Sequence, residues 1–128
     1  MNKDQPPRKR VLIAEDDPAI ASLLSRTLQG HYDVVIAEDG MGALAKAGAP
    51  PPPDLLILDV MMPGLDGFTV AQRVRLLPGL ADVPVIFITA RDAPADVIKG
   101  IQLGARNYIT KPFKLHDVLD KVRKALRR

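Results

Sequence analysis

The feature that most constrains the fold is the regular alternation of short apolar runs with longer segments of helical spacing. Four runs are wholly apolar, and a fifth, more polar strand is expected near the end; in order they are Val11–Ala14, Val34–Ile36, Leu55–Leu58, Val85–Ile88 and Asn107–Thr110. Runs without polar alternation are typical of strands buried on both faces. Strict alternation of strand and helix predicts a parallel sheet with helices on both sides. We therefore expect an α/β fold with a doubly wound parallel sheet of five strands and five helices.

The segments between the runs carry the usual signs of helix boundaries. Asp17-Pro18 joins a capping side chain to a proline and predicts that the first helix starts there. Asp39-Gly40 opens a second helix, Phe68–Leu77 forms a third, and Asp92 starts a fourth. The expected inner face of the last helix consists of Leu115, Val118, Leu119, Val122 and Leu126.

Charge is distributed unevenly along the 128 residues, whose net charge is +3. The first ten residues hold four basic and one acidic side chain, and the last eight hold five basic and none acidic. Residues 11–120 hold nine basic and fourteen acidic side chains, so the body is acidic. Nucleic-acid-binding domains usually carry a basic stripe on the folded body, so we do not expect this chain alone to bind nucleic acid. We interpret residues 1–9 as a flexible basic tail and residues 10–128 as one domain.

Composition excludes several classes of protein. The chain is 47% hydrophobic and 26% charged, which is ordinary for a globular domain and excludes a disordered chain. It has no cysteine, so disulfide scaffolds, thiolate metal sites and cysteine nucleophiles are excluded. No apolar run is long enough to span a membrane, and the N-terminal MNKDQPPRKR has no apolar stretch typical of a secretory signal. We expect a cytoplasmic protein with no membrane partner.

Polar side chains end most of the apolar runs, and in an open α/β sheet such residues share one rim. They are Glu15, Asp16 and Asp17 after the first run, Asp59 after the third, Thr89 after the fourth and Lys111 after the fifth. Carboxylates so close repel each other by about 4 kcal/mol at ~4 Å near a protein surface. A hard divalent cation such as Mg²⁺ is the natural counter-charge. Carboxylates, Mg²⁺, a hydroxyl and a lysine together suit phosphoryl chemistry, in which a carboxylate can itself be the nucleophile.

Each of these residues also has an ordinary structural explanation. An acidic triplet before a helix often only complements the helix dipole, and a lone Asp after a strand is usually a turn residue. A Thr at a strand end usually satisfies backbone groups, and a Lys before Pro is usually on the surface. These explanations, taken one residue at a time, account poorly for a polar or charged residue at each of four strand ends. The joint arrangement therefore favours a site, with Asp17 assigned to the helix cap.

Four stretches, in the same order and spacing, resemble the receiver domain of bacterial two-component response regulators: VLIAEDDP, LLILDVMMPGLDG, VIFITA and GARNYITKPF. The resemblance covers residues 10–128. It implies the flavodoxin-like receiver fold, a five-stranded parallel sheet in the order 2-1-3-4-5 with two helices on one face and three on the other.

The resemblance also implies a role for individual residues. Asp59 matches the phosphoacceptor. Asp16 and Asp59 match direct ligands of Mg²⁺, the backbone carbonyl of Met61 matches a third ligand, and Glu15 is expected to act through water.

A second group of matched residues is expected to handle the phosphoryl group and to switch. Thr89 matches the hydroxyl that moves to the phosphoryl oxygen, and the small Ala90 leaves room for that group. Lys111 matches the lysine that pairs with it, and the bond from Lys111 to Pro112 matches the family's cis peptide. Tyr108 matches the aromatic residue that turns inward when Thr89 moves.

The function implied by the resemblance is a phosphorylation-dependent signalling switch. A histidine kinase or histidine phosphotransfer protein would phosphorylate Asp59, and the surface of the fourth helix, fifth strand and last helix would change to control an output domain, a partner or a homodimer. Related winged-helix regulators usually carry two acidic residues that help to build their active dimer. This chain has Arg106 and Asn107 at those positions, so the family's usual dimer is not favoured. No enzyme activity is expected beyond self-directed phosphotransfer and autodephosphorylation. His31 and His116 are expected to be exposed polar residues and not the phosphodonor.

Three alternatives remain at this point. An aspartate-nucleophile phosphohydrolase would resemble DxDxT at the first strand, where this chain has EDD, and Asp59 is followed by Val60. A flavodoxin-type flavin carrier would need a phosphate-binding loop after the first strand, where the acidic EDDP would repel phosphate. A receiver-shaped interaction module would work without phosphorylation.

Overall fold

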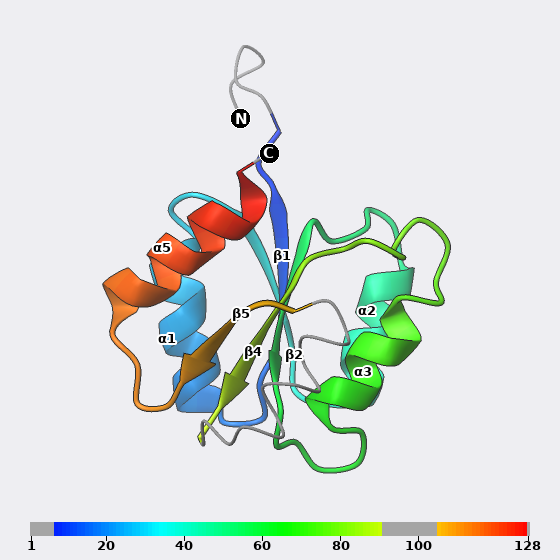
Figure 1. Cartoon of the computed structure of the whole chain (residues 1–128), viewed down its shortest axis with the longest axis horizontal. Coiled ribbons are helices and arrows are strands. Elements are labelled where there is room, and N and C mark those ends of the chain that lie inside the picture. Colours follow the sequence, from blue (N-terminus) through cyan, green and yellow to red (C-terminus); the bar gives the residue numbers. More distant parts are fainter. Residues whose placement is uncertain (1–6, 91–104, 128) are drawn as a thin grey trace.

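The computed structural model of the chain describes residues 7–90 and 105–127, and of residues 105–107 only the backbone. It contains one sheet of five parallel strands in the order β2-β1-β3-β4-β5 (Figure 1). The strands are β1 (Arg10–Ala14), β2 (Asp33–Ala37), β3 (Leu55–Asp59), β4 (Val85–Thr89) and β5 (Ala105–Thr110). This is the strand order implied by the receiver resemblance, and the doubly wound α/β fold is confirmed.

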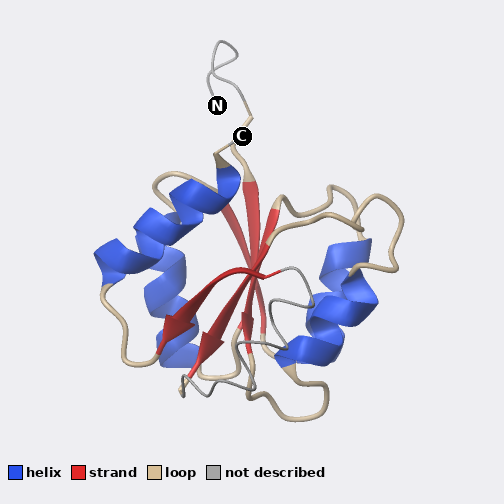
Figure 2. Cartoon of the chain, viewed as in Figure 1, coloured by secondary structure: helices blue, strands red, loops and turns tan. Residues whose placement is uncertain are grey.

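Helices cover both faces of the sheet (Figure 2). The described helices are α1 (Pro18–Leu28), α2 (Gly40–Gly48), α3 (Gly67–Val74) and α5 (Leu115–Leu126). Helices α1 and α5 lie on one face, and α2 and α3 lie on the other (Figure 1). The described residues thus contain four helices, and the helix expected to start at Asp92 lies outside them.

The apolar runs of β1, β3 and β4 are buried on both faces, as their sequences predict, whereas the apolar run of β2 is only partly buried because β2 is an edge strand. Along β3, Leu56 and Leu58 pack with the core under α2 and α3, whereas Leu55 and Ile57 pack with the core under α1 and α5. Residues of one strand alternate between the two cores, so each position must be apolar. Burial of all five β3 residues, including Asp59, follows from this central position.

Aspartates cap the three helices that follow β1, β2 and β3. The side chain of Asp17 accepts a hydrogen bond from the backbone N–H of Ala19 at 2.9 Å. Asp39 and Asp66 cap α2 and α3 in the same way, at 2.7 and 2.8 Å from the acceptor oxygen to the backbone nitrogen. Such caps satisfy backbone donors that have no partner inside the helix. The role predicted for Asp17 is therefore confirmed.

Two helices differ from expectation. Helix α3 ends at Val74 instead of Leu77, because the chain tightens there: the N–H of Leu77 donates to the carbonyl of Val74, three residues back, at 2.9 Å. The buried residues of α5 are Val118, Val122 and Ala125, whereas Leu115 is 40% exposed. Leu115 is the first residue of α5, at the end of the helix's buried face.

The two ends of the domain lie together. Strand β1 begins and α5 ends at the same end of the molecule, and the carboxyl ends of the strands lie at the opposite end (Figure 1). None of the described helices has both the length and the apolar character needed to cross a membrane.

Candidate functional site

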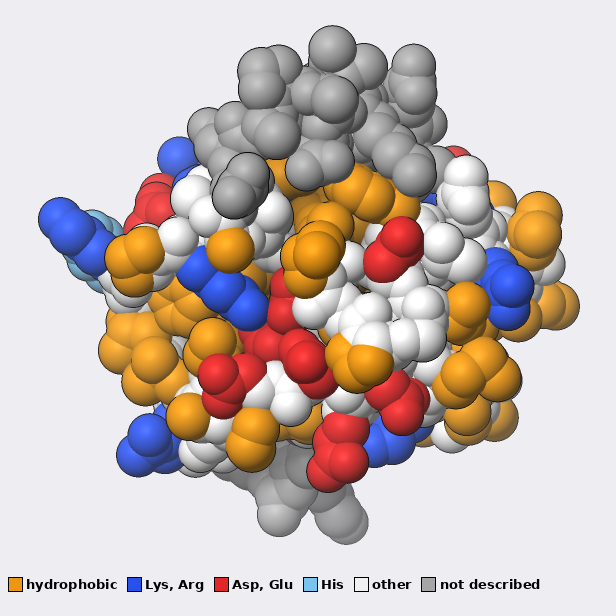
Figure 3. Space-filling model, turned by 90° about the horizontal axis from the view of Figure 1, so that it is seen from below, with side chains coloured by type: hydrophobic (Ala, Val, Ile, Leu, Met, Phe, Trp, Pro, Cys, Tyr) orange, Lys and Arg blue, Asp and Glu red, His pale blue; other side chains and the backbone are white. Residues whose placement is uncertain are grey.

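Three strands bring buried polar side chains to the carboxyl edge of the sheet. Asp59 ends β3, Thr89 ends β4, and Glu15 directly follows β1. Their exposed fractions are 2%, 3% and 1%, and they are the buried polar or charged residues of the described chain. Viewed from this end, acidic side chains gather at the centre of the surface with basic side chains beside them (Figure 3).

Lys111 links two of these carboxylates. Its Nζ lies 2.9 Å from Oε1 of Glu15 and donates to Oδ2 of Asp59 at 3.1 Å. The backbone N–H of Lys111 also donates to the carbonyl of Thr89 at 2.8 Å, so the ends of β4 and β5 are held together. The structure thus brings Lys111 to the carboxylates, as its place after the fifth strand predicts. Its ion pair with Glu15 is an addition to the sequence prediction.

The charged groups of the site shift one another's pKa values. Burial, together with the hydrogen bond to Asp59, raises the pKa of Glu15 to about 7, although Lys111 acts against this rise. Burial acts to lower the pKa of Lys111, but its hydrogen bonds with Glu15 and Asp59 outweigh burial and raise that pKa. Lys111 is therefore protonated at neutral pH. One ammonium group faces several carboxylates, so the site is short of positive charge.

A metal ion would supply the positive charge that the site lacks. Glu15, Asp16 and Asp59 each offer one carboxylate oxygen, and these atoms lie within 4.8 Å of one another. Asp16 is exposed, whereas the other two are buried, so the cluster meets solvent on one side. Hard oxygen donors of this kind suit Mg²⁺, which retains several waters when it binds. The donor set is consistent with the magnesium site expected from the sequence.

The backbone after Asp59 is tightly held. The N–H of Met61 donates to Oδ1 of Asp59 at 3.1 Å, and the N–H of Val60 donates to the carbonyl of Ile88 at 2.8 Å. Val60 and Met62 are buried in the core, whereas the side chain of Met61 is 73% exposed. The loop is therefore anchored on both sides of Met61, whose backbone N–H lies beside the Asp59 carboxylate.

The other predicted residues lie along the ends of β4 and β5. Ala90 is exposed directly after Thr89, and the peptide bond from Lys111 to Pro112 is cis. The half-buried ring of Tyr108 lies 5.7 Å from the ring of Phe87 on the neighbouring strand, between centroids. The side chains of Arg106 and Asn107 lie outside the described residues, as does the fourth-helix part of the predicted switch surface.

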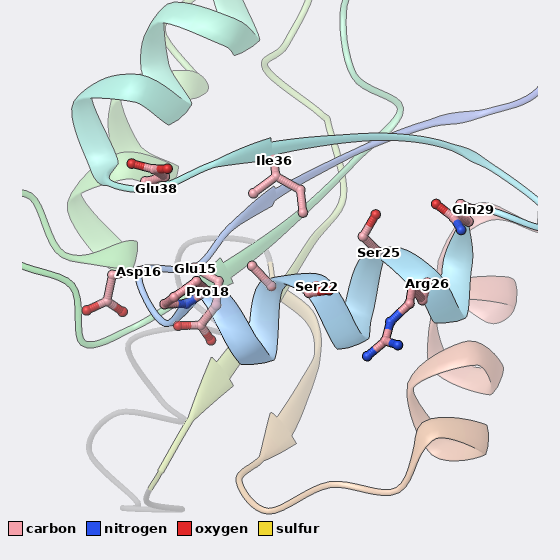
Figure 4. A pocket seen from close by; sticks show the side chains of 10 residues that line it. Glu15, Asp16, Pro18, Ser22, Ser25, Arg26, Gln29, Ile36 and Glu38 are labelled. Atoms are coloured by element: carbon pink, nitrogen blue, oxygen red, sulfur yellow. The ribbon is translucent and has the colours of Figure 1, made fainter.

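A cavity of about 590 Å³ opens beside the acidic cluster, between α1 and β2. Its lining includes Glu15, Asp16 and Glu38 at one end and Arg26 further along α1 (Figure 4). Sequence reasoning missed this cavity because it depends on how α1 packs beside the edge strand. It opens to the exposed carboxylates of Asp16 and Glu38, beside the buried Glu15.

Comparison with known proteins gives one consistent family. The sequence profile described as the response regulator receiver domain matches residues 11–123. The DNA-binding dual master transcriptional regulator RpaA of Synechocystis is 47% identical over 120 residues, which are 93% of this chain and 49% of that protein. The alkaline phosphatase synthesis transcriptional regulatory protein PhoP of Bacillus subtilis is 40% identical over 121 residues, which are 94% of this chain and 49% of that protein. The chain spans about half the length of these regulators.

Solved structures agree with this family. The chemotaxis protein CheY4 of Vibrio cholerae superposes with a TM-score of 0.87 at 33% identity, covering 93% of this chain and 99% of that one. A putative response regulator from Chloroflexus aurantiacus also gives a TM-score of 0.87, at 35% identity, with 96% and 100% covered. Both the sequence and the backbone arrangement are thus similar to those of response regulators.

Proposed function

The chain belongs to the receiver-domain family of response regulators, and from this membership we propose that it is a phosphorylation-dependent switch in which Asp59 accepts the phosphoryl group. The observation that supports the proposal best is the environment of Asp59. Its carboxylate is buried at the end of β3, Lys111 Nζ lies 3.1 Å from Oδ2, and Glu15 and Asp16 lie close enough to share a cation with it.

In the proposed reaction, a carboxylate oxygen of Asp59 attacks the phosphorus of a phosphohistidine on a donor protein. A new O–P bond forms, the N–P bond breaks, and the histidine takes up a proton as it leaves. The N–H of Met61 and the ammonium of Lys111 orient the two carboxylate oxygens before the attack. Mg²⁺, held by Asp16, Asp59 and the Met61 carbonyl, with Glu15 acting through water, would neutralise charge on the phosphoryl oxygens.

Phosphorylation would change the charge at Asp59 from one negative unit to about two and add strong acceptor oxygens. The hydroxyl of Thr89 and the ammonium of Lys111 are the donors placed to respond, with Ala90 leaving room for the group. Since Tyr108 packs against Phe87 on the adjacent strand, rearrangement at Thr89 would alter the packing of Tyr108. Reversal of a 1:99 equilibrium needs ~5.5 kcal/mol, which several charge-assisted hydrogen bonds of up to ~3 kcal/mol each would supply.

The proposed partners follow from the same chemistry. A histidine kinase or histidine phosphotransfer protein would donate the phosphoryl group in the cytoplasm. The altered surface, formed by the fourth helix, β5 and α5, would then control an output domain, a partner or a homodimer. DNA-binding relatives such as RpaA make a DNA-binding output the first candidate. Residues 1–9 are proposed as a tail to the receiver domain of residues 10–128, and no turnover beyond self-directed phosphotransfer and autodephosphorylation is expected.

The test is intact-mass spectrometry after incubation with Mg²⁺ and acetyl phosphate. We expect one added phosphoryl group, which is absent from Asp59→Asn and is not formed when EDTA is present. A phosphorylated histidine phosphotransfer protein serves as a second donor. No addition from either donor, with Mg²⁺ binding shown by calorimetry, would contradict the proposal and favour an interaction module that works without phosphorylation.

A further inference from the structure

Gly67 lies directly against the backbone of Asp59. A Cβ atom on Gly67 would lie 2.4 Å from the carbonyl oxygen of Asp59 and 3.1 Å from the Cα of Val60. Both are backbone atoms at a strand end that is also hydrogen-bonded to β4, so they cannot move aside without disturbing the backbone of the sheet. The N–H of Gly67 donates to the Val60 carbonyl at 3.1 Å. The first residue of α3 is thus in direct contact with the strand end that carries the proposed phosphoacceptor.

Gly40 makes a similar contact from another helix. A Cβ atom on Gly40, the first residue of α2, would lie 2.6 Å from the Cβ of Leu65 and 2.7 Å from its carbonyl oxygen. It would also lie 2.9 Å from a methyl carbon of Val70 in α3. Leu65 belongs to the loop 60–66 that joins Asp59 to α3. Helix α2 therefore supports the far end of the same loop.

We propose that Gly40 and Gly67 are positioning residues for the phosphoryl site, because their missing side chains let α2 and α3 clamp the loop that begins at Asp59. The inference rests on the proposed function and deepens it. Between the two glycines the loop carries the Met61 N–H, which donates to Asp59, and the Met61 carbonyl, the third proposed metal ligand. Displacement of the loop at either contact would move both groups relative to the carboxylate.

The proposal predicts a defect that general helix stability does not explain. Alanine has a higher helix propensity than glycine by about 1 kcal/mol, so Gly→Ala within a helix is favourable where space allows. Gly48, the last residue of α2, is such a place: a Cβ there meets only the side chain of Leu77, at an ordinary 3.8 Å. Gly48→Ala is therefore a matched control for Gly40→Ala in the same helix.

The experiment measures Mg²⁺ binding to the unphosphorylated chain by calorimetry, with the Met61 amide signal followed by NMR. For Gly40→Ala we expect a dissociation constant raised roughly 10-fold or more, as for loss of other groups that orient metal ligands. The Met61 amide signal should shift because its bond to Asp59 changes. Gly67→Ala should show the same effects, and Gly48→Ala should behave as the wild type in both measurements.

A folded Gly40→Ala variant with wild-type Mg²⁺ affinity and an unshifted Met61 amide would overturn the proposal. If Gly40→Ala does not fold, Leu65→Gly decides, since it removes the Cβ that abuts Gly40 and should also weaken Mg²⁺ binding. Unchanged affinity in Leu65→Gly would count against the proposal in that case. Neither readout requires phosphorylation, so failure of the wild type to accept a phosphoryl group would refute the proposed function separately.

Discussion

At the scale of single residues, the balance of charge in the site depends on Lys111. Its ammonium group contacts two carboxylates that are almost fully buried, those of Glu15 and Asp59. Removing one partner from a buried ion pair leaves a charge without compensation, which is far more costly than losing an exposed pair. The same lysine therefore has a structural role in addition to its proposed role toward the phosphoryl group.

The two contacts of Lys111 predict the effect of Lys111→Met. In EDTA, the free energy of unfolding at pH 8, where Glu15 is largely ionised, should fall by about 3 kcal/mol, because the two buried carboxylates lose their counter-charge. The matched control is Lys124→Met, which breaks an exposed pair with Asp120 and should cost less than about 1 kcal/mol. Urea unfolding of both variants measures the difference. Equal losses in the two variants would contradict the prediction.

The raised pKa of Glu15 predicts how stability changes with pH. Burial and Asp59 raise this pKa from 4.5 to about 7, so between these values the folded protein holds a proton that the unfolded chain has released. The free energy of unfolding in EDTA should therefore decrease as pH rises from 4.5 to 7, by up to about 3 kcal/mol. Glu15→Gln cannot titrate and should remove this contribution. An identical slope in Glu15→Gln, measured by urea unfolding, would show that another group is responsible.

The sequence predicts some of these residue-scale contacts but not others. Asp59, Thr89 and Lys111 could be placed at one rim, because strand ends in a parallel sheet share an edge. The ion pair between Glu15 and Lys111 could not be foreseen, since it depends on side-chain orientation within that rim. The contacts of Gly40 and Gly67 were likewise invisible, because a close approach between elements leaves no local signal.

At the scale of elements, Asp17 illustrates how a residue beside the site can serve the helix instead. Its side chain caps α1, and its backbone N–H donates to Oε2 of Glu15 at 3.1 Å. Asp17→Ala should lower the free energy of unfolding by about 1 kcal/mol. Asp17→Asn keeps a capping oxygen and should cost much less. Urea unfolding in EDTA tests this, and equal losses for Ala and Asn would show that charge, and not capping, is what matters.

Element boundaries were predictable where one residue sets them locally. The Asp17-Pro18 pair marks the start of α1, and Asp39 marks the start of α2, as the structure shows. The end of α3 was not predictable, because Arg73 to Leu77 are compatible with either a helix or a tighter turn. The exposure of Leu115 follows from where α5 meets the sheet, which is a tertiary property with no signature in helical spacing.

At the scale of the whole molecule, the fold separates charge. Helices α1, α2 and α3 begin at the site edge with aspartate caps, and α1, α2, α3 and α5 carry basic residues in their last turns at the other edge. This arrangement complements the helix dipoles. Each cap carries a full negative charge against roughly half a positive charge at a helix start, so the caps and exposed Glu38 leave this edge negative beyond the site's own carboxylates.

The field predicts the salt dependence of phosphorylation by an anionic donor. With acetyl phosphate at saturating Mg²⁺, the initial rate should rise between ~0.01 M and ~0.15 M salt, where the Debye length falls from ~30 Å to ~8 Å. Intact-mass time courses measure it. Glu38→Gln should weaken the effect of salt on the rate. The control is Asp82→Asn, which should leave the effect unchanged because Asp82 is an exposed residue before β4, at the opposite edge of the sheet. A rate that falls with salt would contradict this prediction.

The placement of the two chain ends has a practical consequence. Strand β1 begins and α5 ends at the same end of the molecule, away from the carboxylates (Figure 1). Domains with neighbouring ends tolerate circular permutation and insertion into other proteins. This domain could therefore be spliced into a surface loop of an unrelated host with its reactive edge facing outward. In such a chimera, the proposed covalent modification of Asp59 would act on the host through two junctions at one end of the domain, which makes the domain a candidate component of a chemically gated biosensor.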